Sequence, residues 1–129
     1  MKILSIILPL LMYAACPGAA QTMAEIKHAK TLFEGAWINK KDRRHLTISI
    51  ENDGYITIND WVGKWKGQSV DAYKAFIRKG KLIIPADTDH HGPYSELYRI
   101  GNTMVYMTED NFLSDKTTIE KIIFTRTKW

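Results

Sequence analysis

The amino-acid sequence predicts a mainly β protein: an eight-stranded antiparallel up-and-down barrel preceded by one short helix. Apolar and polar residues alternate with a period of two along most of the chain after residue 34, and short turn signals such as Asn52-Asp53-Gly54 separate the alternating runs. Alternation buries one face of a strand and exposes the other. Two-residue turns force neighbouring strands to run antiparallel.

The helical segment covers Thr22–Lys30, where Met23, Ile26 and Ala29 recur at three- and four-residue spacing. Thr22 and Glu25 stand at the spacing of a capping box. A helix this short is marginal without packing. We therefore expect it to dock on the barrel or close one end.

The strands follow from the change of period. In the second, Leu46, Ile48 and Ile50 alternate with polar residues. The fourth is ambiguous, because its aromatic and aliphatic residues also fit helical spacing. The predicted strands are Glu34–Ile38, His45–Glu51, Tyr55–Asp60, Ala72–Arg78, Lys81–Pro85, Tyr94–Ile100, Thr103–Thr108 and Thr118–Thr127.

Closure of the sheet is predicted from its edges. Unpaired edge strands invite aggregation, and closure into a barrel removes them. Eight strands enclose just enough room for side chains or one small ligand. An open sandwich is the alternative.

The first twenty residues differ from the rest. Lys2 is their only charge, an apolar run follows over 3–15, and small residues end the segment at Gly18-Ala19-Ala20. This pattern is typical of a secretory signal peptide. Residues 21–129 then form a single β-barrel domain, exported to the periplasm or secreted.

A second processing route is equally open. Tyr13-Ala14-Ala15-Cys16 resembles the lipobox of bacterial lipoproteins, although an aliphatic residue is usual where Tyr13 stands. The resemblance implies lipidation of Cys16 and an outer-membrane lipoprotein, with membrane contact only through that anchor. Cys16 is the only cysteine, so no disulfide can form within the chain.

The charge pattern argues against a nucleic-acid partner. The chain has 18 basic and 14 acidic residues, a net charge of +4, and the charges are interspersed apart from the cluster Lys40–Arg44. A nucleic-acid protein usually carries a denser basic face. We interpret the charges as a solvated surface.

The two ends of the predicted barrel resemble lipocalin-like proteins of the calycin group. In those families a Gly-x-Trp on the first strand follows a short helical segment, and a basic residue on the last strand packs over the Trp ring. Gly35 and Trp37 match the first element, and Arg126 matches the second. The resemblance implies a structural cation–π contact at the closed end of the barrel. Small bacterial envelope proteins and periplasmic inhibitors of this type are similar in size, although those inhibitors carry a disulfide.

Aromatic residues are the candidates for ligand binding. Trp61 and Trp65 share one face of an extended segment and can stack on flat ligands. Tyr73, Tyr98 and Tyr106 can line a cup with their hydroxyl groups toward a ligand. The alternative for all five is a place in the core.

No catalytic, metal-binding or cofactor signature stands out. Asp87, Asp89 and His91 could share one face of an extended segment, but a polar loop ending at Gly92-Pro93 is the simpler interpretation. No nucleophile elbow, phosphate loop or dinucleotide motif is present in the sequence. We expect no metal and no cofactor.

These observations lead to one functional expectation and two alternatives. The expectation is an exported, non-catalytic envelope protein that binds a small apolar molecule in the barrel or a partner protein on its rim. The first alternative is a periplasmic inhibitor or immunity-like protein that acts on an exported enzyme. The second is a hydrolase whose site assembles only in space.

Overall fold

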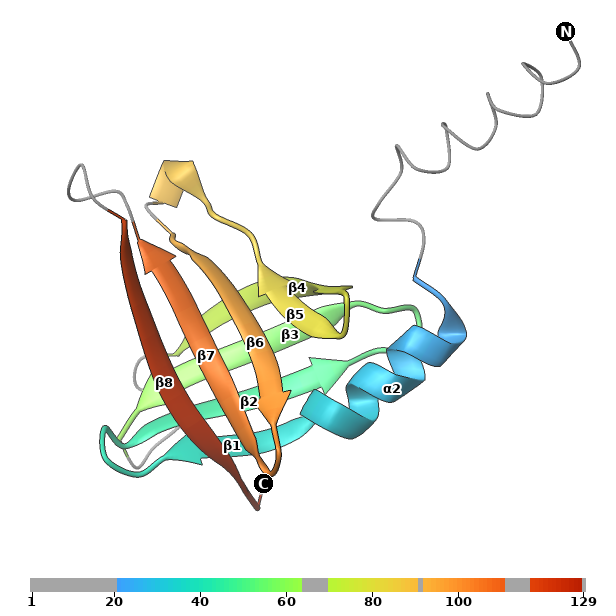
Figure 1. The fold of residues 1–129 in the computed structure, drawn as a ribbon, viewed down its shortest axis with the longest axis horizontal. Coiled ribbons are helices and arrows are strands. Elements are labelled where there is room, and N and C mark those ends of the chain that lie inside the picture. Colours follow the sequence, from blue (N-terminus) through green and yellow to red (C-terminus); the bar gives the residue numbers. More distant parts are fainter. Residues whose placement is uncertain (1–20, 64–69, 91, 111–116, 129) are drawn as a thin grey trace, which may run out of the picture.

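The computed structural model describes residues 21–63, 70–90, 92–110 and 117–128. Within these ranges the strands form one closed antiparallel barrel in chain order, as Figure 1 shows. The predicted fold class is therefore confirmed. The strands are β1 Gly35–Asn39, β2 Arg44–Ile50, β3 Ile56–Val62, β4 Asp71–Arg78, β5 Lys81–Ile84, β6 Tyr94–Ile100, β7 Thr103–Asp110 and β8 Thr118–Thr127.

Closure joins the first strand to the last. Ala36 pairs with Thr127, Trp37 with Arg126 and Ile38 with Thr125. Every other neighbouring pair is antiparallel and consecutive in sequence. The alternative of an open sandwich is wrong.

The segment predicted as Ala72–Arg78 is a strand and not a helix. It pairs on one side with β3, where Tyr73 stands opposite Ile58, and on the other with β5, where Ile77 stands opposite Leu82. Pairing on both sides satisfies the backbone of this segment, which its own side-chain pattern could not decide.

The helix α2 spans Met23–Phe33, three residues beyond its predicted end. The Thr22 side chain caps it by accepting a hydrogen bond from the Glu25 backbone N–H, as predicted. Ile26, Ala29 and Phe33 are its buried residues. Burial of Phe33 on the same face as Ala29 extends the helix through the Leu32-Phe33 segment.

Helix α2 lies across the end of the barrel where β1 begins, and the 3-10 turn η2 (Thr88–His90) lies beyond the opposite end (Figure 1). We call the opposite end the mouth. No helix in the described ranges is long and apolar enough to cross a membrane. The predicted signal peptide and Cys16 lie outside those ranges.

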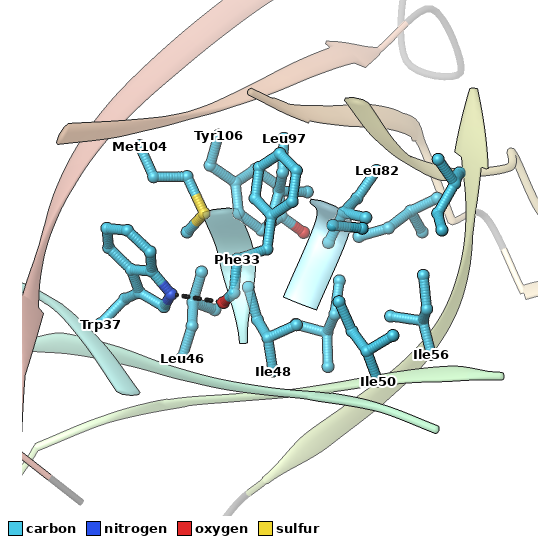
Figure 2. Packing of buried hydrophobic residues seen from close by; sticks show 14 of the residues in the cluster. Phe33, Trp37, Leu46, Ile48, Ile50, Ile56, Leu82, Leu97, Met104 and Tyr106 are labelled. Atoms are coloured by element: carbon cyan, nitrogen blue, oxygen red, sulfur yellow. Dashed lines mark hydrogen bonds between the residues drawn. The ribbon is translucent and has the colours of Figure 1, made fainter. Parts of the chain in front are cut away.

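The half of the barrel next to α2 is filled by side chains. Phe33 reaches from the helix into the centre of this cluster, where Leu46, Ile48, Leu97 and Met104 surround it (Figure 2). Phe33 is 1% exposed, and those four are completely buried. A branched aliphatic core around one aromatic ring gives dense packing.

Trp37, on β1, also belongs to this cluster. It is fully buried, and its indole Nε1 donates a 2.8 Å hydrogen bond to the Phe33 carbonyl oxygen (Figure 2). This carbonyl lies in the last turn of α2, where no backbone N–H of the helix is available to donate to it. The indole therefore ties the end of the helix to β1.

Two arginines complete this tie. The Cζ atoms of Arg126 and Arg99 lie 4.5 Å and 5.3 Å from the centre of a Trp37 ring. Arg126 donates to the Thr31, Leu32 and Glu34 carbonyls, and Arg99 donates to the Leu32 carbonyl. Positive charge at a helix C-terminus is favourable. Burial and the nearby charge of Arg99 lower the pKa of Arg126 below its ordinary value.

Glycine is required at the start of β1. Gly35 has φ +132°, and a Cβ there would lie 3.1 Å from Arg126 Nη1. L-residues with a side chain rarely adopt such a backbone conformation. In the Gly-x-Trp motif, Gly35 therefore provides the unusual backbone conformation and the space for Arg126. Trp37, with its buried indole, follows two residues later.

Substitution of Phe33 by alanine is expected to lower the free energy of unfolding by about 3–5 kcal/mol, because it leaves a large cavity in the filled half of the barrel. Urea denaturation followed by Trp fluorescence measures this. Met23→Ala is the matched control on the same helix, since Met23 is 71% exposed. A loss below about 1 kcal/mol for Phe33→Ala would contradict the role assigned to this ring.

Candidate functional site

A cup of about 640 Å³ opens at the mouth of the barrel. Its walls are side chains near the mouth ends of β2, β4, β6, β7 and β8, and residues of the segment after β5 form one side of its rim. Tyr106 and Ile84 belong both to its lining and to the filled cluster. Other lining residues include Arg44, Asp71, Tyr73, Pro85, Thr108 and Glu120.

An ion pair joins β2 and β3 beside the cup, and its Arg44 is part of the cup lining. Arg44 donates to both carboxylate oxygens of Asp60, from Nε at 2.9 Å and from Nη2 at 2.6 Å. The side chains are 20% and 7% exposed. Burial opposes the charge of Arg44, but the hydrogen bonds and attraction of Asp60 outweigh it and raise the pKa of Arg44 above its ordinary value.

The same guanidinium lies against aromatic rings. Arg44 Cζ is 4.7 Å from the ring centre of Tyr106 and 5.9 Å from that of Phe124. A cation on an aromatic face is stabilised by the ring quadrupole. The Arg44 guanidinium on the cup wall is therefore held by both Asp60 and the two rings.

Two tyrosines, Tyr73 and Tyr106, also line the cup. Burial, and after it the proximity of other acidic groups, raises the pKa of Tyr73 and of Tyr106 above the ordinary tyrosine value. Both hydroxyls therefore keep their protons at neutral pH and can donate or accept a hydrogen bond. Tyr106 is buried at 4% exposure, and Tyr73 is half-buried.

Carboxylates stand around the rim. Asp71 begins β4, and Glu120 lies near the beginning of β8. Asp87 belongs to the segment between β5 and β6, where its Oδ2 lies 2.8 Å from Nδ1 of His90. The hydrogen bond from His90, more than any other contact, lowers the pKa of Asp87 below its ordinary value.

The aromatic residues selected from the sequence are divided between the inside and the outside of the barrel. Tyr73 and Tyr106 both line the cup. Tyr98 lies on the outer wall, with Lys81 Nζ 5.0 Å from its ring centre. Trp65 lies outside the described residues.

Trp61 lies on the outer wall of β3, stacked on His45 with ring centres 5.1 Å apart and planes 9° apart. It also borders a second hollow of about 340 Å³, which shares Arg44, Asp71 and Tyr73 with the cup. Trp61 is therefore beside the cup and not within it.

The charged residues of the cup were missed by the sequence reasoning, although a signal was present. Asp60 continues the buried series of Ile56 and Ile58, and Arg44 precedes Leu46 and Ile48 at the same spacing of two. A charged residue on the buried face of a strand calls for a partner. The spacing of two along each strand therefore could have identified Arg44 and Asp60 as charged residues on the buried face.

The metal-like stretch forms a polar loop. Asp87 and Gly92 exchange two backbone hydrogen bonds of 2.8 Å, and Asp87 pairs with His90. His91 lies outside the described residues. Within the part of the chain that the structure describes, no three His, Cys, Asp or Glu side chains are grouped to hold a metal ion.

Breaking the Arg44–Asp60 ion pair is expected to destabilise the fold. Asp60→Asn should lower the free energy of unfolding by about 2–3 kcal/mol, somewhat less than for a fully buried pair, because Arg44 loses its partner while part of it still reaches water. Chemical denaturation measures the loss. The double variant Arg44→Leu, Asp60→Leu should lose less than Asp60→Asn, and a larger loss in the double variant would contradict this account.

The Asp87–His90 contact predicts a pH effect. A lowered pKa means that the contact is present above the ordinary aspartate range and is lost as pH falls through the folded-state pKa of Asp87. NMR titration of the Asp87 side-chain carboxyl should give a midpoint below that of a free aspartate. His90→Ala should raise this midpoint, whereas His28→Ala on α2 should leave it unchanged. An Asp87 midpoint that does not respond to His90→Ala would disprove the contact in solution.

The geometry thus places a part-buried ion pair, two protonated tyrosines and a rim of carboxylates around one hollow at the open end of an eight-stranded barrel. The opposite end is filled and tied to a helix. No protein-family model, curated protein or solved structure matches this chain.

Proposed function

We propose that this chain is an exported, non-catalytic binding protein of the lipocalin-like kind, which holds one small molecule in the cup at the barrel mouth. The observation that carries the proposal is the cup itself. Its volume of about 640 Å³ is within the range of about 300–1,000 Å³ typical of ligand pockets. The mouth of a β-barrel is one of the places where such pockets occur.

The lining favours an amphipathic ligand over a purely apolar one. Tyr73, Tyr106 and Ile84 offer apolar surface, while Arg44, Asp71 and Glu120 offer charge on the same walls. A wholly apolar ligand would take these charges out of water without giving them a partner, which is costly. The ligand of this proposal carries a ring or short apolar body together with polar groups.

The proposed location follows from the leader. An N-terminal segment with one Lys, an apolar run and a small-residue end supports export. Release at Gln21 would give a periplasmic or secreted protein, and lipidation at Cys16 would give an outer-membrane lipoprotein. Mass spectrometry of the N-terminus distinguishes the two.

A partner protein on the rim is the second candidate. Val62 and Ile119, near the mouth ends of β3 and β8, are 68% and 64% exposed. Exposed apolar residues around a hollow are a common feature of binding sites. An inhibitor of an exported enzyme would use this rim, and its complex would form whether or not the cup is occupied.

Native mass spectrometry of the chain purified from the producing cell tests the cup. The expected result is a bound small molecule that dissociates in the gas phase. Thr108→Trp, which adds an indole to the cup wall, should lose the bound molecule. Ser49→Trp is the matched control, because Ser49 is exposed on the outer face of β2. An unliganded wild-type protein, or a bound molecule that survives Thr108→Trp, would contradict the proposal.

A further inference from the structure

We infer that the cup selects small organic cations, in which an ammonium group is attached to a ring or a short apolar chain. This inference rests on the proposed function and specifies its ligand class. It is carried by the placement of charge on the cup walls, which differs from the charge of the chain as a whole.

Two carboxylates face the cup from opposite sides. Asp71 is on β4 and Glu120 on β8, and these strands are four places apart in the ring of eight. Among the residues that the structure describes, neither carboxylate forms an ion pair. A single positively charged group between them would have a carboxylate on each side.

The other charges of the cup are already occupied. Arg44 is held by both oxygens of Asp60, so the pair is neutral. Asp87 accepts a hydrogen bond from His90. Among the described residues, the cup lining therefore keeps a local excess of negative charge, although the whole chain has a net charge of +4.

The tyrosines suit a cation as well. The ring of Tyr106 already carries the Arg44 guanidinium at 4.7 Å, which demonstrates that this lining accepts positive charge on an aromatic face. Tyr73 lines the same cup and can accept an ammonium group on its ring or at its hydroxyl oxygen. Apolar atoms of the ligand would pack against Ile84 and Pro85.

Two other ligand classes fit less well. An anion would meet Asp71 and Glu120, and the one guanidinium of the cup is already taken. A metal ion needs several ligands in one place, and no such group of three exists among the described residues. An organic cation needs only one or two carboxylates and an aromatic surface.

The test compares three molecules that share one ring and differ in charge: 2-phenylethylammonium, 2-phenylethanol and phenylacetate. Isothermal titration calorimetry with the full chain should give the tightest binding for the ammonium compound, by about fivefold over the alcohol, the ratio expected from one partly exposed ion pair. Phenylacetate should bind more weakly than the alcohol. Added salt should reduce the preference for the cation.

Variants assign the preference to the carboxylates. Asp71→Asn combined with Glu120→Gln should bring the ammonium compound and the alcohol to equal affinity. Glu51→Gln, which removes an exposed carboxylate near the other end of the barrel, should keep the preference. Both residues of the double variant are exposed, and thermal unfolding confirms that the variant folds.

Several outcomes would overturn the inference: an alcohol that binds as tightly as the ammonium compound, a preference that survives the double variant, cation binding that survives Thr108→Trp, or no binding of any of the three. A molecule found in the cup by native mass spectrometry would keep the proposed function standing in each of these cases. Absence of that molecule would contradict the proposed function, whereas a preference for the cation that the double variant abolishes would still support the inferred ligand class.

Discussion

The insertion of Phe33 into one half of the barrel is the interaction on which the rest of the structure depends. An eight-stranded barrel has an interior only wide enough for side chains or one small ligand. Phe33 and the aliphatic residues around it fill the half next to α2. Trp37, Arg99 and Arg126 donate hydrogen bonds to the end of α2 and so fix the helix that carries Phe33. What remains open is the mouth, where the inward-facing side chains are polar and charged.

The part-buried Arg44–Asp60 ion pair lies between the filled half of the barrel and its open mouth. Arg44 and Asp60 lie where the aliphatic filling ends, and Arg44 reaches across to the rings of Tyr106 and Phe124. Replacing such a pair with apolar residues is often neutral or stabilising in proteins. In the proposed function this pair would keep a charged, hydrogen-bonding group on the cup wall, which an apolar pair would not supply.

Most of the architecture could be predicted from the sequence, because a period of two and short turns are local signals. The end of α2 could also have been read, since Phe33 stands four residues after Ala29. The spacing of two indicates that Arg44 and Asp60 face the interior, but their pairing depends on the register that sets Leu46 opposite Asp60. Arg44 was instead expected to be solvated together with Lys40–Arg43. The division of Tyr73 and Tyr106 from Tyr98 likewise depends on which way each strand faces.

The contacts between Arg126 and the end of α2 also constrain how the chain reaches its native state. The hydrogen bond from Arg126 to the Glu34 carbonyl spans 92 positions in sequence, and the pairing of β1 with β8 spans a similar length. Contacts between residues so far apart form late and slow the search for the native topology. The barrel cannot close until β8 is available to pair with β1. Before then β1 keeps a free edge, which is open to pairing with other chains.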